Sequence, residues 1–260
     1  MDLSRLGPGH RSDLEIAWRS GATINDRGDY LILATPDAPT YHWGNVIYVT
    51  GGDVNDAERW KAVFERSFPH ATWISIGLPE APDPAPYEAA GMEVSAEDEL
   101  TSSELTGDPG AHPDYEFRPL RQADWEGWID MQVAGSSEED RAGESRDDYA
   151  TFLADKAALN RRLIEAGDLQ YFGAFADSGI AASLGIARLG ELARYQSVFT
   201  APEHRRRGLA SHLLHVAAAW AGQRGASTFV IVAEADSDAG RIYRRSGFTL
   251  ASHQHIAELA

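Results

Sequence analysis

The chain has 260 residues, of which 43% are hydrophobic, so it can form one large domain or two smaller domains with a real core. It contains no cysteine, which excludes a disulfide scaffold, a thiolate nucleophile and a cysteine zinc site. The formal net charge of -17 opposes binding to nucleic acids and anionic membranes, because phosphate groups would be repelled.

The N-terminus, Met1–Arg5, lacks the basic and apolar regions of a signal peptide. No later apolar run reaches the length of a membrane span. We therefore expect a cytoplasmic protein that has no membrane partner.

The first half of the chain predicts a strand, a loop, a helix and a second strand. Val46–Val49 is a short apolar run, and Thr50–Gly52 interrupts it. Apolar residues then recur at helical spacing between Trp60 and Phe68, and Thr72–Ile76 follows as a second strand. The Pro- and Gly-rich segment 106–113 predicts a linker, which divides the chain into domains 1–105 and 114–260.

The second half begins with one strand, two helices and three strands joined by short turns. We expect these elements at residues 115–120, 124–132, 147–166, 170–175, 180–188 and 192–200. A run of acidic residues lies between the two helices, from Ser137 to Glu144. This run is either a solvated surface or a rim that attracts cations.

A cationic turn then connects a strand to a helix. Pro202 breaks the strand, and from Leu209 the apolar residues recur in steps of three and four. The first amides of a helix have no intrahelical partner and the helix dipole is positive there, so the turn suits a diphosphate. Gly208 allows close approach of the backbone, and a solvated basic loop is the alternative. The predicted phosphate-binding residues are Arg205, Arg206, Arg207, Gly208, Leu209, Ala210 and Ser211.

The remaining residues complete a pattern that resembles a known family. A buried strand, Ser227–Val232, precedes an acidic cap, a short helix, a glycine and a strand from Phe248 to Ile256. The motif R-x-x-G-x-A followed by D-x-x-A-x-x-x-Y-x-x-x-G-F is similar to the GNAT superfamily of acyl-CoA-dependent N-acyltransferases. The resemblance spans about 60 residues closely and extends loosely back to residue 114. It implies an α/β (α+β) fold with a mixed, mostly antiparallel sheet flanked by helices.

The resemblance also implies a set of site residues. Tyr243 takes the place of the family's general acid for the leaving thiolate, although a structural role in the core is the alternative. Ala239 would pack against the pantetheine arm, and Asp236 stands where the family often has asparagine, so one hydrogen bond is in doubt. The strand whose backbone would pair with pantetheine and orient the acetyl carbonyl supplies Val198, Phe199 and Thr200.

The general base is left open. Glu191 and Glu234 both lie at strand ends and are candidates, while water is the alternative. We expect no metal, because neither His212 with His215 nor His253 with His255 has a third ligand at useful spacing.

The first half repeats the second in weaker form. Tyr87, Gly91 and Met92 repeat the Y-x-x-x-G-F spacing, and the preceding elements come in the same order. The loop after the first strand carries Asp53 and Asp56 instead of arginines, and these carboxylates would repel a diphosphate. We predict a tandem arrangement of two GNAT-like domains in which the first is degenerate and binds no CoA; an unrelated domain is the alternative.

These observations predict an N-acyltransferase that moves an acetyl group from acetyl-CoA to the primary amine of a small molecule by direct attack on the thioester. The acceptor can be cationic, and the protein is expected to be a monomer or homodimer. A non-catalytic CoA-binding or interaction module and a protein N-acetyltransferase are the alternatives.

Overall fold

The computed structural model describes residues 3–38, 41–137 and 145–259 as two compact units. The first unit comprises Met1–Leu100, Val232–Arg241 and Thr249–Ala260; the second comprises Thr101–Ile231 and Ile242–Phe248. The acidic run is outside the described residues from Glu138 to Glu144. None of the described helices is both long and apolar enough to cross a membrane.

The strands of the first unit follow the order β1-β2-β3-β4-β11-β5. The pairings of β1 with β2 and of β2 with β3 are antiparallel, whereas β3 and β4 are parallel. The strands are β1 (Thr23–Asp26), β2 (Tyr30–Ala34), β3 (Val46–Val49), β4 (Ser75–Leu78), β5 (Met92–Ser102) and β11 (Thr249–Leu259). The helices are α1 (Pro8–Arg19), α2 (Ala57–Ser67) and α3 (Pro84–Ala89), with a 3-10 turn η1 (His42–Gly44).

Continuous apolar runs explain why β3 and β4 lie inside this unit. Every residue of both strands is buried, as expected for strands that are covered on both faces. On α2 the helical spacing places Trp60, Val63 and Phe64 on one buried face, which packs with Ile47 and Ile76 of the strands. One part of the core of the first unit therefore forms between α2 and the β3–β4 pair. A second part includes Leu14 of α1, Leu33 of β2 and Tyr48 of β3.

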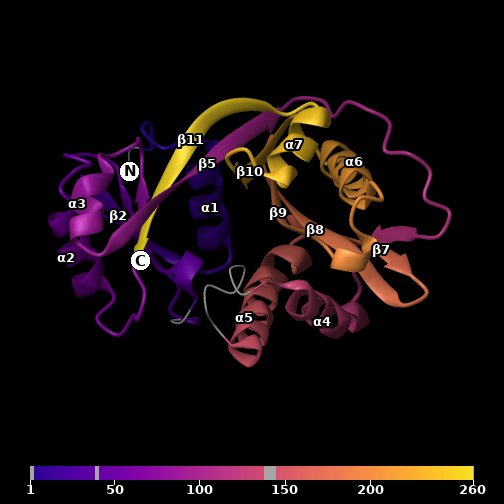
Figure 1. Cartoon of the computed structure of the whole chain (residues 1–260), viewed down its shortest axis with the longest axis horizontal. Coiled ribbons are helices and arrows are strands. Elements are labelled where there is room, and N and C mark those ends of the chain that lie inside the picture. Colours follow the sequence, from indigo (N-terminus) through magenta and orange to yellow (C-terminus); the bar gives the residue numbers. More distant parts are fainter. Residues whose placement is uncertain (1–2, 39–40, 138–144, 260) are drawn as a thin grey trace. The chain divides into compact units, whose positions relative to one another are not determined.

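The C-terminal strand belongs to the first unit, which differs from the expected domain 114–260. β11 pairs with β4 in antiparallel register, from His255 opposite Leu78 to Glu258 opposite Ser75. The pairing gives the edge of β4 a partner, and an unpaired apolar edge would be prone to aggregation. The chain's last strand thus completes the sheet of the N-terminal unit (Figure 1).

The strands of the second unit follow the order β10-β9-β8-β7-β6. All of these pairings are antiparallel except that of β9 with β10, which is parallel. The strands are β6 (Glu116–Pro119), β7 (Leu169–Ala176), β8 (Gly179–Leu189), β9 (Leu192–Thr200) and β10 (Thr228–Glu234). The helices are α4 (Trp125–Gly135), α5 (Arg146–Glu165), α6 (Leu209–Gly222) and α7 (Asp238–Arg245), with 3-10 turns η2 (Gln122–Asp124) and η3 (Pro202–His204).

Helices cover both faces of the β7–β9 sheet. In Figure 1, α4 and α5 lie on one side of these strands and α6 lies on the other. Buried hydrogen bonds join each layer to the sheet: Trp128 Nε1 of α4 donates to Ser183 Oγ at 2.9 Å, and Tyr195 Oη of β9 donates to the carbonyl oxygen of Leu214 in α6 at 2.8 Å. These two buried donors are thus satisfied within the unit.

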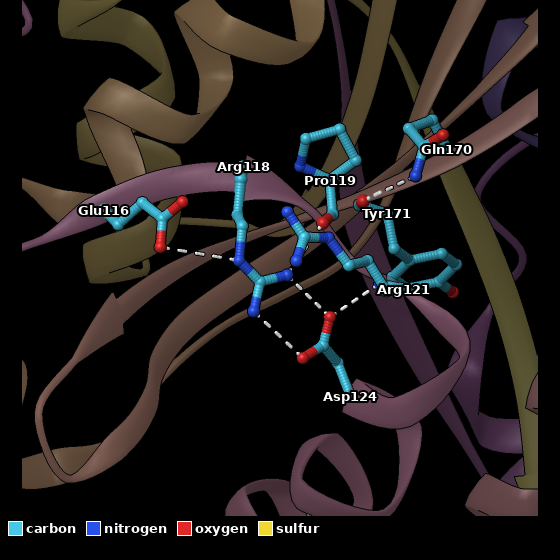
Figure 2. A network of polar contacts seen from close by, with 7 residues as sticks. All are labelled: Glu116, Arg118, Pro119, Arg121, Asp124, Gln170 and Tyr171. Carbon is cyan, nitrogen blue, oxygen red and sulfur yellow. Dashed lines mark hydrogen bonds and ion pairs between the residues drawn. The ribbon is translucent and has the colours of Figure 1, made fainter.

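An arginine clamp fixes the start of α4 to β6 (Figure 2). Arg118 donates two hydrogen bonds to the carboxylate of Asp124, at 2.6 and 3.0 Å, and its guanidinium lies over the Phe175 ring at 3.5 Å. The same carboxylate accepts from the backbone N–H of Arg121, and the Arg118 hydrogen bonds lower the pKa of Asp124. These hydrogen bonds hold β6 against the start of α4. The face of β6 opposite Arg118 therefore has a fixed position.

The segment 106–113, expected as a linker, is bonded to the second unit. It contains no helix or strand, but the backbone N–H of Thr106 donates to the carbonyl oxygen of Ser246 at 3.0 Å. A Cβ on Gly247 would lie 2.9 Å from Thr106 Oγ1, so this glycine is needed for the close approach. The division between the units falls at Leu100 and Thr101.

Candidate functional site

The turn before α6 has the geometry of an open anion site. Arg206 has φ +62° and Gly208 has φ +80°, which reverses the chain immediately before the helix begins at Leu209. Gly208 is the N-cap and provides no side-chain hydrogen bond to the first turn. The amides at the start of α6 are therefore not capped by the N-cap side chain, and they can accept a phosphate group as ligand.

Local hydrogen bonds hold the arginines around this turn. Arg205 Nε donates to the carbonyl oxygen of Thr200 at 3.1 Å, and Arg207 Nη2 donates to that of Glu203 at 3.4 Å. All three arginines are exposed, including Arg206, whose left-handed backbone is uncommon for a non-glycine residue. The three arginines of the predicted phosphate-binding segment are thus contiguous and accessible, whereas Leu209 is buried.

The strand β9 has one edge that is only partly paired. Its pairing with β10 runs from Leu192 opposite Thr228 to Arg194 opposite Val230 and ends there. β9 itself continues to Thr200, so on this edge the stretch 195–200 has no partner from β10. The predicted pantetheine-binding residues Val198, Phe199 and Thr200 lie in this stretch and are half-buried. Backbone N–H and C=O groups that have no partner strand on this edge, next to the cationic turn, suit an extended, amide-containing ligand.

A bulge shapes this edge. On β8, Gly185 is opposite Gln196 and Ser183 is opposite Phe199, so β9 has an additional residue between them. Ser197 lies in the bulge with φ +50°, a strained conformation for serine. Its Oγ is 3.5 Å from the hydroxyl of the buried Tyr171, which accepts a hydrogen bond from Asn160 of α5 at 3.1 Å. The sequence gives no signal for this bulge, because nothing in the local pattern marks a serine at positive φ.

Tyr243 is buried in α7, with only 5% of its surface exposed. Its ring packs edge-on to Phe248. Burial raises the pKa of Tyr243 well above the usual value, and the nearby Arg194 cation only partly opposes this shift. The phenol is therefore protonated at neutral pH, the state that a proton donor requires.

Glu191, predicted as a possible base, lies at the opposite end of β9 from the phosphate turn. Its carbonyl oxygen accepts from the backbone N–H groups of Ser227 and Thr228, where β10 begins, and its side chain is exposed. It precedes Ser197 by six residues, a distance of about 20 Å along a strand. The structure therefore places Glu191 away from the unpaired stretch of β9, and its role as the base stays a prediction.

The other predicted residues lie at the end of β10 or after it, in the part of the chain assigned to the first unit. Glu234 and Asp236 are exposed, and Ala239 is half-buried at the start of α7. Asp236 has φ +59°, and its carbonyl oxygen accepts from Arg241 Nη1 at 2.5 Å. Their roles as base and cofactor contacts stay predictions. Within the described ranges no group of three or more histidine, aspartate or glutamate residues is arranged to hold a metal ion.

In the first unit, the loop before α2 corresponds to the turn before α6, and hydrogen bonds and an ion pair of its own side chains occupy it. Asp56 accepts a hydrogen bond from the backbone N–H of Arg59 and so caps α2. The Arg59 side chain forms an ion pair with Asp29, whose carbonyl oxygen accepts the backbone N–H groups of Thr50 and Gly51. The hydroxyl of Tyr87, which the Y-x-x-x-G spacing aligns with Tyr243, donates a buried hydrogen bond to the carbonyl oxygen of Val54 at 2.6 Å.

Comparison with known proteins identifies the fold. The model of the acetyltransferase (GNAT) family matches residues 117–248, just over half of the chain. A GCN5-related N-acetyltransferase from Kribbella flavida is 17% identical with a TM-score of 0.64, and the match covers 98% of this chain and 96% of that chain. A functionally unknown conserved protein from Staphylococcus epidermidis is 12% identical with a TM-score of 0.72, covering 92% and 94% of the two chains.

A tandem GNAT protein from the clavulanic acid biosynthesis pathway is also similar, at 14% identity and a TM-score of 0.53, and the match covers 95% of this chain and 86% of that chain. A search of curated protein sequences finds no match. At these identities the structures establish the fold alone. The predicted GNAT resemblance and the predicted fold class, a mixed α/β fold with a mostly antiparallel sheet and flanking helices, are confirmed.

Proposed function

Because the chain belongs to the acetyltransferase (GNAT) family, whose members transfer acyl groups from acyl-CoA, we propose that it transfers an acetyl group from acetyl-CoA to a small primary amine. The observation that carries this proposal is the open turn before α6, with left-handed residues at Arg206 and Gly208 and no N-cap side chain. The amides of the first turn and the arginines bind the diphosphate, as the helix dipole favours.

The unpaired edge of β9 binds the rest of the cofactor in this proposal. Backbone groups of Val198, Phe199 and Thr200 pair with the amides of pantetheine, which lie next to the diphosphate along the strand. The bulge at Ser197 orients the backbone at the point where the thioester carbonyl lies. Pairing with a fixed strand positions the thioester before the amine arrives.

Tyr243 supplies the proton for the departing sulfur. The neutral amine attacks the carbonyl carbon, the C–N bond forms, and the C–S bond breaks with its electron pair on sulfur. Tyr243 donates its phenolic proton to that sulfur, and the amine loses one proton to water or to Glu234. The high pKa that burial gives Tyr243 keeps the proton available until the thiolate develops.

Turnover separates this proposal from a non-catalytic CoA-binding module. Thiol release from acetyl-CoA is followed with a panel of small primary amines, and in parallel the mass of a set of peptides is measured after incubation. We expect amine-dependent thiol release without peptide acetylation. Binding of CoA without thiol release would support a binding module instead, and a mass increase of peptides alone would support a protein N-acetyltransferase.

A further inference from the structure

The segment 106–113 places an imidazole against the phosphate turn. A Cβ built on Gly208 would lie 3.2 Å from Cε1 and 3.6 Å from Nε2 of His112, so the ring edge faces the N-cap of α6 directly. The sequence indicated only a Pro- and Gly-rich connection here. His112 therefore extends the surface of the turn with a side chain that lies almost a hundred positions earlier in the chain.

Aromatic contacts and a hydrogen bond fix the position of His112. Its ring packs edge-on to His212 with centroids 5.2 Å apart and lies 5.6 Å from Phe117. Phe117 in turn stacks on His212 at 3.8 Å. Phe117 precedes Arg118 in β6. Because side chains alternate along a strand, Phe117 lies on the face of β6 opposite the Arg118–Asp124 contact of Figure 2.

The hydrogen bond also determines which nitrogen of His112 carries a proton. Nε2 is 2.8 Å from the carbonyl oxygen of Pro109, and a carbonyl only accepts, so Nε2 is the donor. In the neutral ring Nδ1 then carries no proton and cannot donate to a phosphate. Protonation adds both a donor at Nδ1 and a positive charge to the ring that faces Gly208.

The charged and titratable groups around His112 are few. From α6 it is faced by His212, whose pKa is lowered first by burial and then by His112. From β6 it is faced by Phe117, which carries no charge. The turn next to Gly208 supplies Arg205, Arg206 and Arg207, and its own segment supplies Asp108, whose carboxylate accepts from the backbone N–H of Gly110. A bound diphosphate would add an anion to this surface, and it would favour a protonated His112.

We propose that His112 is a further cofactor-binding residue, which takes up a proton and contacts the diphosphate of CoA held by the turn before α6. This inference rests on the proposed function, because it requires that the turn binds CoA. Its consequence is that the affinity for CoA increases as the pH falls through the range in which histidine titrates.

Calorimetric titration of the full-length protein with dephospho-CoA tests this inference. That ligand keeps the diphosphate but lacks the 3′-phosphate, a monoester that itself titrates near pH 6. We expect the natural protein to bind roughly five- to tenfold more tightly at about pH 6 than at about pH 8, the size expected for a charge-assisted contact. In His112→Gln the two affinities should agree within about twofold. The natural protein should also take up more protons on binding than His112→Gln, as measured in buffers of different ionisation enthalpy.

Matched variants separate charge from packing. His112→Phe keeps the ring contacts with Phe117 and His212 but cannot be protonated, so it should behave as His112→Gln does. His215→Gln changes a histidine one turn further along α6, where Nδ1 is 2.9 Å from the carbonyl oxygen of Ser211, and should retain the natural pH dependence. Melting temperatures report whether each variant is folded.

Three results would overturn the inference: equal pH dependence in the natural protein and His112→Gln, tighter binding by either variant, or an effect seen with CoA but absent with dephospho-CoA. The last result would place the contact at the 3′-phosphate. Failure of the natural protein to bind CoA at any pH would instead refute the proposed function.

Discussion

The turn before α6 and the loop before α2 occupy the same place in two strand–loop–helix–strand segments, and in each case the two strands are parallel neighbours. The helix α6 begins after an N-cap glycine that leaves the first turn open, whereas α2 begins with the carboxylate of Asp56 bonded to the N–H of Arg59. The same backbone arrangement therefore leaves the first turn of one helix open, as the proposed diphosphate site requires, and closes that of the other.

The tyrosines of the two segments differ in the same way. The hydroxyl of Tyr87 donates its proton in a hydrogen bond to the carbonyl oxygen of Val54, in the loop before α2. Tyr243 is buried at the end of the second segment, and burial raises its pKa. The phenol therefore stays protonated, as the proposed general acid must be. The comparison predicts that the first unit binds no cofactor, because its own acidic and phenolic groups satisfy the turn.

Replacing each of the two tyrosines separately by phenylalanine gives the largest expected effects on kcat and stability. Tyr243→Phe should lower kcat by about ten- to a thousandfold with little change in CoA affinity, because one general acid is lost while positioning survives. Tyr87→Phe should leave kcat per folded molecule unchanged and lower the free energy of unfolding by about 1 to 3 kcal/mol, because the buried carbonyl of Val54 loses its partner. Melting temperature and kcat are measured on the same preparations. A destabilised Tyr243→Phe with normal kcat would show that Tyr243 is a structural residue.

Removal of the side-chain cap of α2 tests whether the turns of the two units have separate roles. Asp56→Ala should lower the free energy of unfolding by about 1 kcal/mol, because the first turn of α2 loses its side-chain acceptor. CoA affinity should not change, since the Arg59 side chain at this turn stays paired with the Asp29 carboxylate. Denaturant unfolding and calorimetry measure the two quantities. Weaker CoA binding by this variant would argue against separate roles for the two turns.

The pH dependence of kcat gives the smallest expected effect. A general acid must be protonated, and a pKa raised above its usual value keeps the phenol protonated to higher pH. A tyrosine with the usual pKa of about 10 would lose about half of kcat at pH 10. We therefore expect no such loss between neutral pH and about pH 10 with saturating substrates. A twofold fall at that pH would indicate an unshifted Tyr243 or a different acid.

The elements near the turn could be predicted because their signals are local. Arginines, a glycine and a helical apolar pattern lie within one stretch, and the strand, turn and helix formed where the pattern placed them. The position of β11 could not be predicted, since its alternation is compatible with any antiparallel partner and only the packed sheet selects β4. The distance between Glu191 and the unpaired stretch of β9 could not be predicted either, since a carboxylate at a strand end does not reveal which end a ligand occupies.

Two features of the site leave almost no trace in the sequence. The bulge at Ser197 depends on a serine held at positive φ by the surrounding structure, which no local propensity encodes. The segment around His112 has the Pro and Gly content of a linker, and such a composition is shared by flexible connections and by turns fixed through long-range contacts. Contacts between distant segments therefore decide both features.

The stoichiometry of CoA binding tests the central claim most directly. Calorimetry on the natural protein, Gly208→Ala and Gly52→Ala compares two glycines with nearly the same backbone, at φ +80° and +76°, so each substitution carries a similar strain. We predict one CoA per chain for the natural protein and for Gly52→Ala, and at least tenfold weaker binding for Gly208→Ala, whose methyl group would lie 3.2 Å from Cε1 of His112 and push that ring at the proposed ligand site. Two CoA per chain, or a loss of affinity in Gly52→Ala that Gly208→Ala does not show, would contradict the account.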